Sequence, residues 1–403
     1  MGGGFLVNVA LARTQTKEEY GMFALSYSGY ALLVGLYHAA ILEAYTVYGS
    51  GRYRERHSEY LRLIIRSNAV ICVLLTGTLL CCFLVLSWLT PRLMSQALLG
   101  LGLAAGILLS GHLLRRAFYL QKRAALAAKT SLIFFGAVSC GLWLTLKAHL
   151  LDSFSAYLIL ALGWVIAGAV VGRQLEFGRS KQHFLEVERS YWREHWNFSK
   201  WVLATAFVFQ FSTQGYYWLV AGFLSVGEVG ELRAMYNLIA PSDQIFIALG
   251  YLVIPAMASH YAMKRVGNLL SLWKRYMLAI LGVTALFTLG ALILGQKLMH
   301  TLYAGRFDGL GPLFSLMALL PVLMAMGTTM AQALKAMEKP KLVFYGFLSS
   351  GAATFAVGIP LVTHFGLRGA VYGMLVSGAT FSVAVGVGFF MAVYRRGTKL
   401  RVS

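Results

Sequence analysis

The chain has 403 residues, of which 58% are hydrophobic and only 12% charged, whereas soluble domains are roughly a quarter charged. Long apolar runs recur to the end of the chain, which excludes a soluble globular protein. The formal net charge is +20, but the cations stand between the apolar runs, and this placement argues against a nucleic-acid-binding surface. Together these features predict an all-α, polytopic membrane protein.

About twelve segments reach or approach the roughly 20 apolar residues that cross a bilayer. In chain order we expect membrane spans at 1–12, 20–48, 67–89, 95–114, 130–151, 153–172, 201–226, 234–258, 276–295, 310–334, 342–363 and 367–393. The first rises only about 18 Å, against a hydrocarbon core of about 30 Å. We therefore expect a truncated first helix, either because Met1 is an internal start or because the helix is a true half-span.

Most of the 35 Lys and Arg residues lie in alternate connections. The basic connections include those around Arg52, Arg115, Arg173, Lys264 and Arg395. Because cytoplasmic loops carry the excess of cations, this pattern predicts a multi-pass protein with both termini in the cytoplasm.

The longest polar stretch, 173–200, divides the chain into two halves. We expect an N-terminal six-helix lobe at 1–172, a cytoplasmic amphipathic linker at 173–200, and a C-terminal six-helix lobe with a basic tail at 201–403. Tyr191, Trp192 and Trp196 stand among charges in this linker. That spacing suits a helix on the membrane surface or an ordinary linker helix.

The two halves share a faint internal repeat. The tripeptide EYG at 19–21 opens the second span and EVG at 228–230 opens the eighth, while RAF at 116–118 follows the fourth span and KAM at 335–337 follows the tenth. Matching positions in two six-span halves indicate parallel repeats, a common plan among transporters.

Several stretches resemble a known family. NVALAR at 8–13 and KEEYGMFAL at 17–25 resemble the opening of Wzx-type oligosaccharide flippases, within the multidrug/oligosaccharidyl-lipid/polysaccharide exporter superfamily. LRRAFY at 114–119, VGEVGELRA at 226–234 and LYAGRF at 302–307 resemble later signatures of that family, in the same order.

The resemblance implies two six-helix lobes around a central cavity and an alternating-access transporter. The implied substrate is an undecaprenyl-diphosphate-linked oligosaccharide, moved from the inner to the outer leaflet of the bacterial inner membrane for surface polysaccharide biosynthesis. The implied partners are membrane lipids, a polysaccharide polymerase and chain-length proteins. We expect no enzymatic activity, no cofactor, no metal and no nucleic acid.

A flippase must shelter a diphosphate and sugar hydroxyls from hydrocarbon, so it needs cations for the phosphates and neutral polar groups for the sugars. The candidate substrate-binding residues are Arg13, Arg233, Arg115, Arg116, Gln210 and Gln214. The four arginines are alternatively interfacial anchors. The two glutamines share a helix face and alternatively make a hydrogen bond between helices.

Ionisable groups inside spans are the candidates for ion coupling. These are Glu43 in the second span and Asp243 in the eighth, with a structural ion pair or an exposed span end as the alternative. His38 and His112 are expected to be packed polar residues.

Three other functions remain open. A drug/cation antiporter of the same superfamily would use Glu43 and Asp243 as buried acids. A peptidoglycan-precursor flippase would have a more cationic cavity. A membrane polysaccharide ligase or polymerase would carry its catalytic groups in a large outer loop, whereas the longest expected outer connection, 295–309, is short.

Overall fold

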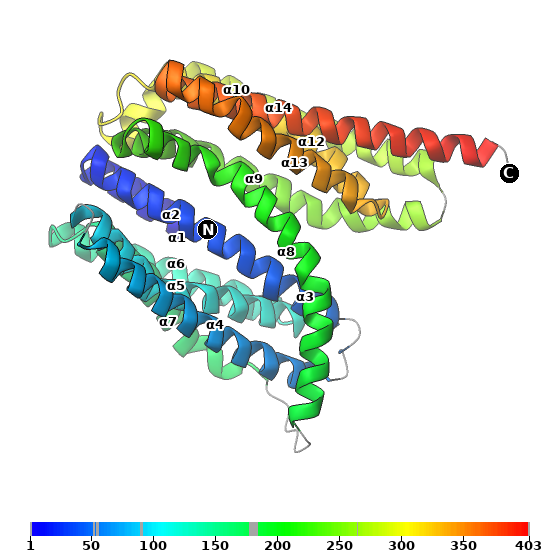
Figure 1. The fold of residues 1–403 in the computed structure, drawn as a ribbon, viewed down its shortest axis with the longest axis horizontal. Helices are drawn as coiled ribbons and strands as arrows, with labels where there is room; N and C mark the ends of the chain where they lie inside the picture. Colours follow the sequence, from blue (N-terminus) through cyan, green and yellow to red (C-terminus); the bar gives the residue numbers. More distant parts are fainter. Residues whose placement is uncertain are drawn as a thin grey trace. The chain divides into compact units, whose positions relative to one another are not determined.

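The computed structural model describes residues 2–50, 53, 56–88, 92–176, 184–263 and 265–401, and every regular element in these ranges is helical. The chain forms two compact units, Met1–Gln210 and Phe211–Ser403. Figure 1 follows the helices along the chain from blue to red.

The first unit is built around α5. This helix packs against α2, α4, α6 and α7, so it is the central helix of the unit. The elements are α1 (Gly2–Thr14), α2 (Lys17–Tyr37), the π-helix η1 (His38–Leu42), α3 (Glu43–Ser50), α4 (His57–Leu86), α5 (Arg92–Leu120), α6 (Ala124–Lys147), α7 (Ser153–Val171), the 3₁₀-helix η2 (Gly172–Gln174) and the first part of α8 (Phe184–Phe223).

In the second unit, α12 packs against α9, α10, α13 and α14. Its core includes Trp273, Ile280, Leu334, Phe381 and Phe389. The elements that follow α8 are α9 (Val226–Ala262), α10 (Val266–Tyr303), α11 (Gly311–Met317), α12 (Leu320–Ala336), α13 (Pro340–Ala356) and α14 (Gly358–Arg401).

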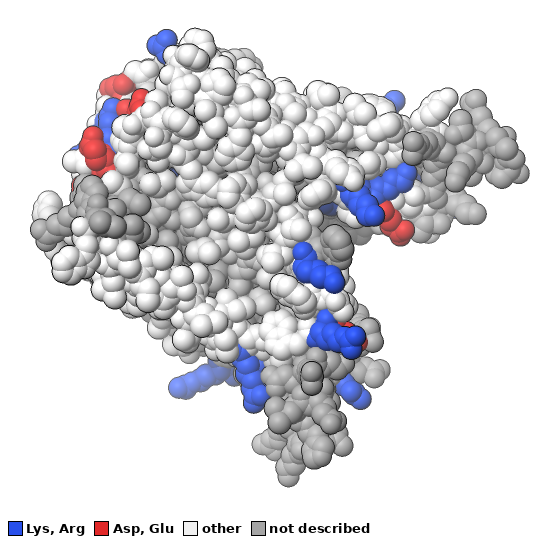
Figure 2. Space-filling view, in the orientation of Figure 1, with Lys and Arg blue, Asp and Glu red and all other residues white. Residues whose placement is uncertain are grey.

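The outer surfaces of these helices suit lipid. Among the described residues, eight helices are long and apolar enough to cross a membrane. Large apolar side chains are exposed along them, such as Val73, Leu132 and Ile293. Most of the face in Figure 2 carries no Lys, Arg, Asp or Glu. The predicted fold class, an all-α polytopic membrane protein, is confirmed.

The weak internal repeat has a structural cause in each unit. Thr16 caps α2 by accepting a hydrogen bond from the backbone N–H of Glu19, and the Glu19 carboxylate accepts one from the Thr16 N–H. Ser225 caps α9 by accepting from the N–H of Glu228. Both acids stand at the third helical position, where a carboxylate also interacts favourably with the helix dipole. The repeated Glu-x-Gly is therefore a helix-start signal.

Several helices differ from the predicted spans. The second span contains the π-helical turn η1, and the predicted span 310–334 is two helices, α11 and α12, with Pro321 in the first turn of α12. Helices α9 and α10 begin at Val226 and Val266, several residues before the predicted spans. Gly366 breaks α14 with a φ of 60° and a ψ of −139°, a conformation that is open essentially to glycine alone.

The predicted linker, 173–200, is described only in part, because residues 177–183 lie outside the described residues. From Phe184 the chain is helical without interruption through position 200 and into the predicted seventh span. In this stretch Tyr191 and His195 are buried, whereas Trp192 and Trp196 are exposed. One face of the helix therefore packs on the first unit. Contact of its other face with a membrane surface stays a prediction.

Candidate functional site

His38 stands where the second span changes its winding. The α-helix α2 ends at Tyr37, and His38 begins the five-residue π-helix η1, after which α3 continues. Short π-helical turns inside α-helices are rare and are found frequently at functional sites. The turn places His38 against α5, which packs on α2.

The imidazoles of His38 and His112 meet edge to face, with ring centroids 5.0 Å apart and an interplanar angle of 74°. The Nε2 atom of His38 is buried and has no hydrogen-bond partner among the described residues. Buried polar atoms are nearly always satisfied. The Nε2 atom of His38 is therefore available to a ligand or a water molecule.

Arg115 and Arg116 lie near the His38–His112 pair. Both guanidinium groups interact electrostatically with His38 and with His112. Both are half-buried, and within the part of the chain that is described neither has a carboxylate partner. His38, His112, Arg115 and Arg116 form what we term the cationic cluster.

This arrangement suits an anion with several oxygen atoms. Guanidinium groups bind phosphate through paired N–H donors, and hydrogen bonds to charged groups are the stronger kind. Imidazole N–H groups supply further donors. A diphosphate offers enough acceptors to satisfy both arginines and the orphaned nitrogen of His38.

Trp164 of α7 lies behind His112, with ring centroids 6.2 Å apart. The indole also packs so closely on Gly111 that a Cβ at position 111 would overlap the ring. Small residues permit this kind of close approach between helices in lipid. Tight packing of α5 on α7 therefore holds the Trp164 indole against the His112 ring.

The second unit contains a second cluster of polar residues, centred on α9, with Tyr217 from α8 and Tyr303 from α10. The Arg233 guanidinium lies 5.8 Å from the centroid of the Tyr217 ring, within cation–π range. One turn along, the Tyr236 hydroxyl donates a hydrogen bond to Asp243 at 2.9 Å. Tyr303 of α10 donates to the carbonyl oxygen of Ala234. Arg233 also interacts electrostatically with Tyr236 and Tyr303.

Four of the eight predicted site residues are thus distributed over two clusters. The structure brings Arg115 and Arg116 together with two histidines, and it brings Arg233 together with Tyr236, the hydrogen-bond partner of Asp243. Arg13 is exposed at the end of α1. The 21 residues of α2 separate this end from His38, a rise of about 30 Å, so Arg13 does not join the cationic cluster.

The remaining candidates have separate environments. Glu43 is exposed at the start of α3. Gln210 packs on Gly35 of α2 so closely that a Cβ at position 35 would overlap the amide. Gln214 is half-buried, and its side-chain oxygen has no partner among the described residues. Whether these residues bind substrate or couple ions stays a prediction.

The sequence interpretation had treated His38 and His112 as packed polar residues. A signal was available for His112, because Arg115 and Arg116 follow it by three and four residues, which places all three on one face of a helix. No comparable signal existed for His38, since its position depends on the π-helical turn and on the register of α2 against α5.

No family model and no curated protein matches the sequence. Solved structures do match in fold. An inward-facing multidrug resistance MATE family transporter of the MOP superfamily gives a TM-score of 0.82 at 11% identity, covering 100% of this chain and 95% of that one. The lipid II flippase MurJ, in an inward closed conformation, gives 0.72 at 13% identity, covering 99% and 89%.

A third match is a MOP superfamily transporter from Pyrococcus furiosus, described as having a binding pocket of reverse polarity. It gives a TM-score of 0.70 at 12% identity and covers 98% of this chain and 91% of that one. At such identities these matches show the fold alone. The chain is a multi-pass membrane protein with the fold of MOP superfamily transporters.

Proposed function

We propose that this protein is a flippase that moves an undecaprenyl-diphosphate-linked oligosaccharide from the inner to the outer leaflet of the bacterial inner membrane, for surface polysaccharide biosynthesis. The proposal is for transport, with no bond made or broken. The proposed partners are the membrane lipids and, downstream, a polysaccharide polymerase with its chain-length proteins.

The cationic cluster carries the proposal. Arg115 and Arg116 interact electrostatically with a half-buried histidine pair and have no carboxylate partner among the described residues. Holding unpaired cations in a lobe that faces lipid is costly, so a site that retains them is suited to an anionic ligand. A diphosphate is the anionic part of the proposed substrate, and the resemblance of LRRAFY at 114–119 to the flippase signature falls on the same residues.

The test is deletion of the gene in its own host. We expect loss of a surface polymer together with accumulation of the lipid-linked oligosaccharide on the inner leaflet, both restored by the wild-type gene. Accumulation of lipophilic cationic drugs should be unchanged. A strain that keeps its full surface polysaccharide would refute the proposal, and arrest of cell-wall synthesis would favour a peptidoglycan-precursor flippase.

A second candidate function, a drug/cation antiporter, is favoured by one observation. Asp243 lies in the second unit, is half-buried and accepts a hydrogen bond from Tyr236. An ionisable residue within a span is a candidate for binding a cation. Efflux of ethidium that is lost in Asp243→Asn and kept in Arg115→Gln would establish this function in place of the first. The nearby charge of Arg233 makes it the weaker candidate.

A further inference from the structure

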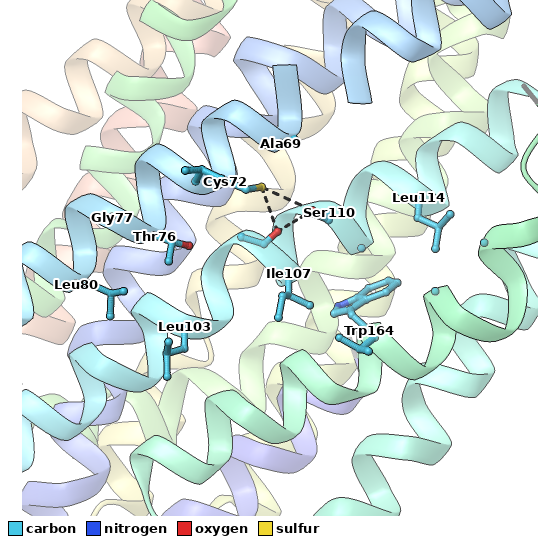
Figure 3. Close-up of a pocket in the computed structure, with 16 residues that line it drawn as sticks. Ala69, Cys72, Thr76, Gly77, Leu80, Leu103, Ile107, Ser110, Leu114 and Trp164 are labelled. Atoms are coloured by element: carbon cyan, nitrogen blue, oxygen red, sulfur yellow. Dashed lines mark hydrogen bonds between the residues drawn. The ribbon is translucent and has the colours of Figure 1, made fainter. Parts of the chain in front are cut away.

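The helix that carries the cationic cluster also borders an apolar groove on its other face. The groove lies between α4, α5 and α7 and encloses about 810 Å³. Figure 3 shows Ile107 and Leu114 of α5 and Trp164 of α7 along it, with Cys72 and Thr76 of α4 opposite. From Leu103 to Leu114 the groove follows α5 for a rise of about 16 Å.

Ser110 and Cys72, two polar residues of the lining, make their hydrogen bonds within the protein. Ser110 donates to the carbonyl oxygen of Gly106 at 2.8 Å and accepts from Asn68 at 3.0 Å. The Cys72 thiol also lies 3.2 Å from the Gly106 oxygen. These polar atoms are therefore satisfied within the protein, and the surface left for a ligand is mostly apolar. Val73, on the α4 side, is 71% exposed, so the groove is open toward the bilayer.

One end of the groove leads to positive charge. Leu114 and Gly172 line this end, and each is followed directly by an arginine, Arg115 and Arg173. Arg173 is exposed and, like Arg115, has no carboxylate partner among the residues that are described. An apolar groove with two cations next in sequence to the residues at its end is complementary to a lipid with an anionic head and a long tail.

Trp164 joins the groove to the cationic cluster. Its indole lines the groove on one side and contacts the His112 ring on the other. The groove end at Leu114 is next in sequence to Arg115 of the cationic cluster.

Three glycines leave the groove wide. At Gly77 and Gly172 nothing lies within 4 Å of where a Cβ would stand, and at Gly168 only a Leu114 methyl approaches, at 3.9 Å. The groove therefore has room beside these glycines for a bulky, methyl-branched chain, and a side chain added at Gly77 or Gly168 would occupy that room.

We propose that the groove between α4, α5 and α7 binds the isoprenyl chain of the lipid-linked substrate while the diphosphate engages the cationic end. This inference rests on the proposed function for the identity of the lipid. It assigns a second binding surface, on the bilayer side of α5, to the same substrate.

The test adds a side chain to the groove at glycines that have open space beside them. Gly77→Leu and, separately, Gly168→Leu place a side chain in the groove. Gly136→Leu is the matched control, since Gly136 is an exposed glycine of α6 that also has nothing within 4 Å and lies outside the groove. Binding of undecaprenyl phosphate to the full-length protein is measured by native mass spectrometry, with farnesyl phosphate and phosphatidylglycerol in parallel, and melting temperatures report folding.

We expect undecaprenyl phosphate to bind the wild type and Gly136→Leu equally, and to bind both groove variants about tenfold more weakly, because the contact of a few methylene groups is lost. Farnesyl phosphate and phosphatidylglycerol should bind weakly to all four proteins. Equal binding to folded groove variants and to Gly136→Leu would overturn the proposal, as would a preference for phosphatidylglycerol, which would mark the groove as a site for bulk lipid.

The two proposals fail separately. If the groove variants flip lipid-linked oligosaccharide as fast as Gly136→Leu and bind undecaprenyl phosphate as well, the groove assignment is wrong and the flippase function stands. If the wild type binds undecaprenyl phosphate in the groove but flips no lipid-linked oligosaccharide, the function is wrong and the groove assignment stands.

Discussion

His195 donates a hydrogen bond from Nε2 to the carbonyl oxygen of Ala40, 2.7 Å away, inside the π-helical turn of the second span. Ser199 donates to the same oxygen at 2.7 Å. Because a carbonyl only accepts, Nε2 carries the proton, and Nδ1 accepts from the Tyr60 hydroxyl at 2.8 Å. The neutral imidazole of His195 therefore fixes the first part of α8 to the second span, at Ala40, which is two residues beyond His38.

This geometry predicts a pH dependence. Burial lowers the pKa of His195, while the hydrogen bond to Ala40 raises it by less. Below the ordinary value of about 6.5, the unfolded chain binds a proton that the folded protein resists, so stability falls as pH falls from about 6.5 toward the lowered value. We expect the melting temperature of the wild type to drop between pH 7.5 and 5.5.

His195→Gln separates this effect from other titrations. Its side-chain amide still reaches toward Ala40 but does not titrate, so the drop in melting temperature should be smaller than in the wild type. Parallel pH profiles for the two proteins would show that His195 does not control the acid sensitivity.

Arg115 and Arg116 are predicted to hold the substrate diphosphate. Losing a hydrogen bond to a charged group costs about 1.5–3 kcal/mol, and about 1.4 kcal/mol is a factor of ten in affinity. Arg115→Gln and Arg116→Gln should therefore each weaken binding of an undecaprenyl-diphosphate lipid by about ten- to a hundredfold. Isothermal titration in detergent measures this.

The control is Lys129→Gln, which removes one exposed cation from α6 of the same unit. Equal effects from Lys129→Gln and from the two arginine variants would mean that only net charge matters. Arg115→Lys should recover part of the affinity, since it keeps the charge and loses the paired donors.

The break at Gly366 predicts a backbone-specific loss of stability. No heavy atom lies within 4 Å of a Cβ built there, so Gly366→Ala introduces strain without a clash, on the order of 1–3 kcal/mol. Gly282→Ala, at an exposed helical position of α10 with equally open space, should instead gain about 0.5–1 kcal/mol. Thermal unfolding in detergent would contradict this account if both variants moved in the same direction.

Sequence periodicity and apolarity predicted the all-α membrane fold because lipid allows few other structures. Helix ends were less well predicted. Helices such as α4 and α10 extend beyond the apolar stretch, as α10 does from 276 back to Val266, and hydropathy alone does not report a polar helix extension. The π-helical turn at His38 contacts α5 and accepts hydrogen bonds from α8 at Ala40, and composition does not report such contacts.

The candidate site was predicted in half. The position of Arg115 and Arg116 at the end of a span, and the resemblance of the surrounding residues to a family signature, both indicated that this basic pair is a candidate for substrate binding. The contact of His38 with His112 was not predicted, because sequence spacing does not report contacts between residues 74 positions apart on different helices. The contact of Arg233 with Tyr217 likewise joins two helices.

The most direct measurement of the central claim is the initial rate at which proteoliposomes flip an undecaprenyl-diphosphate-linked oligosaccharide, under potassium–valinomycin potentials at fixed pH. Two negative charges crossing 100 mV gain roughly 5 kcal/mol if the full field is crossed. We expect flipping to accelerate when the destination side is positive and to fall to the protein-free rate in the Arg115→Gln/Arg116→Gln double variant. Flipping that ignores the potential, follows an imposed pH gradient and persists in the double variant would contradict it.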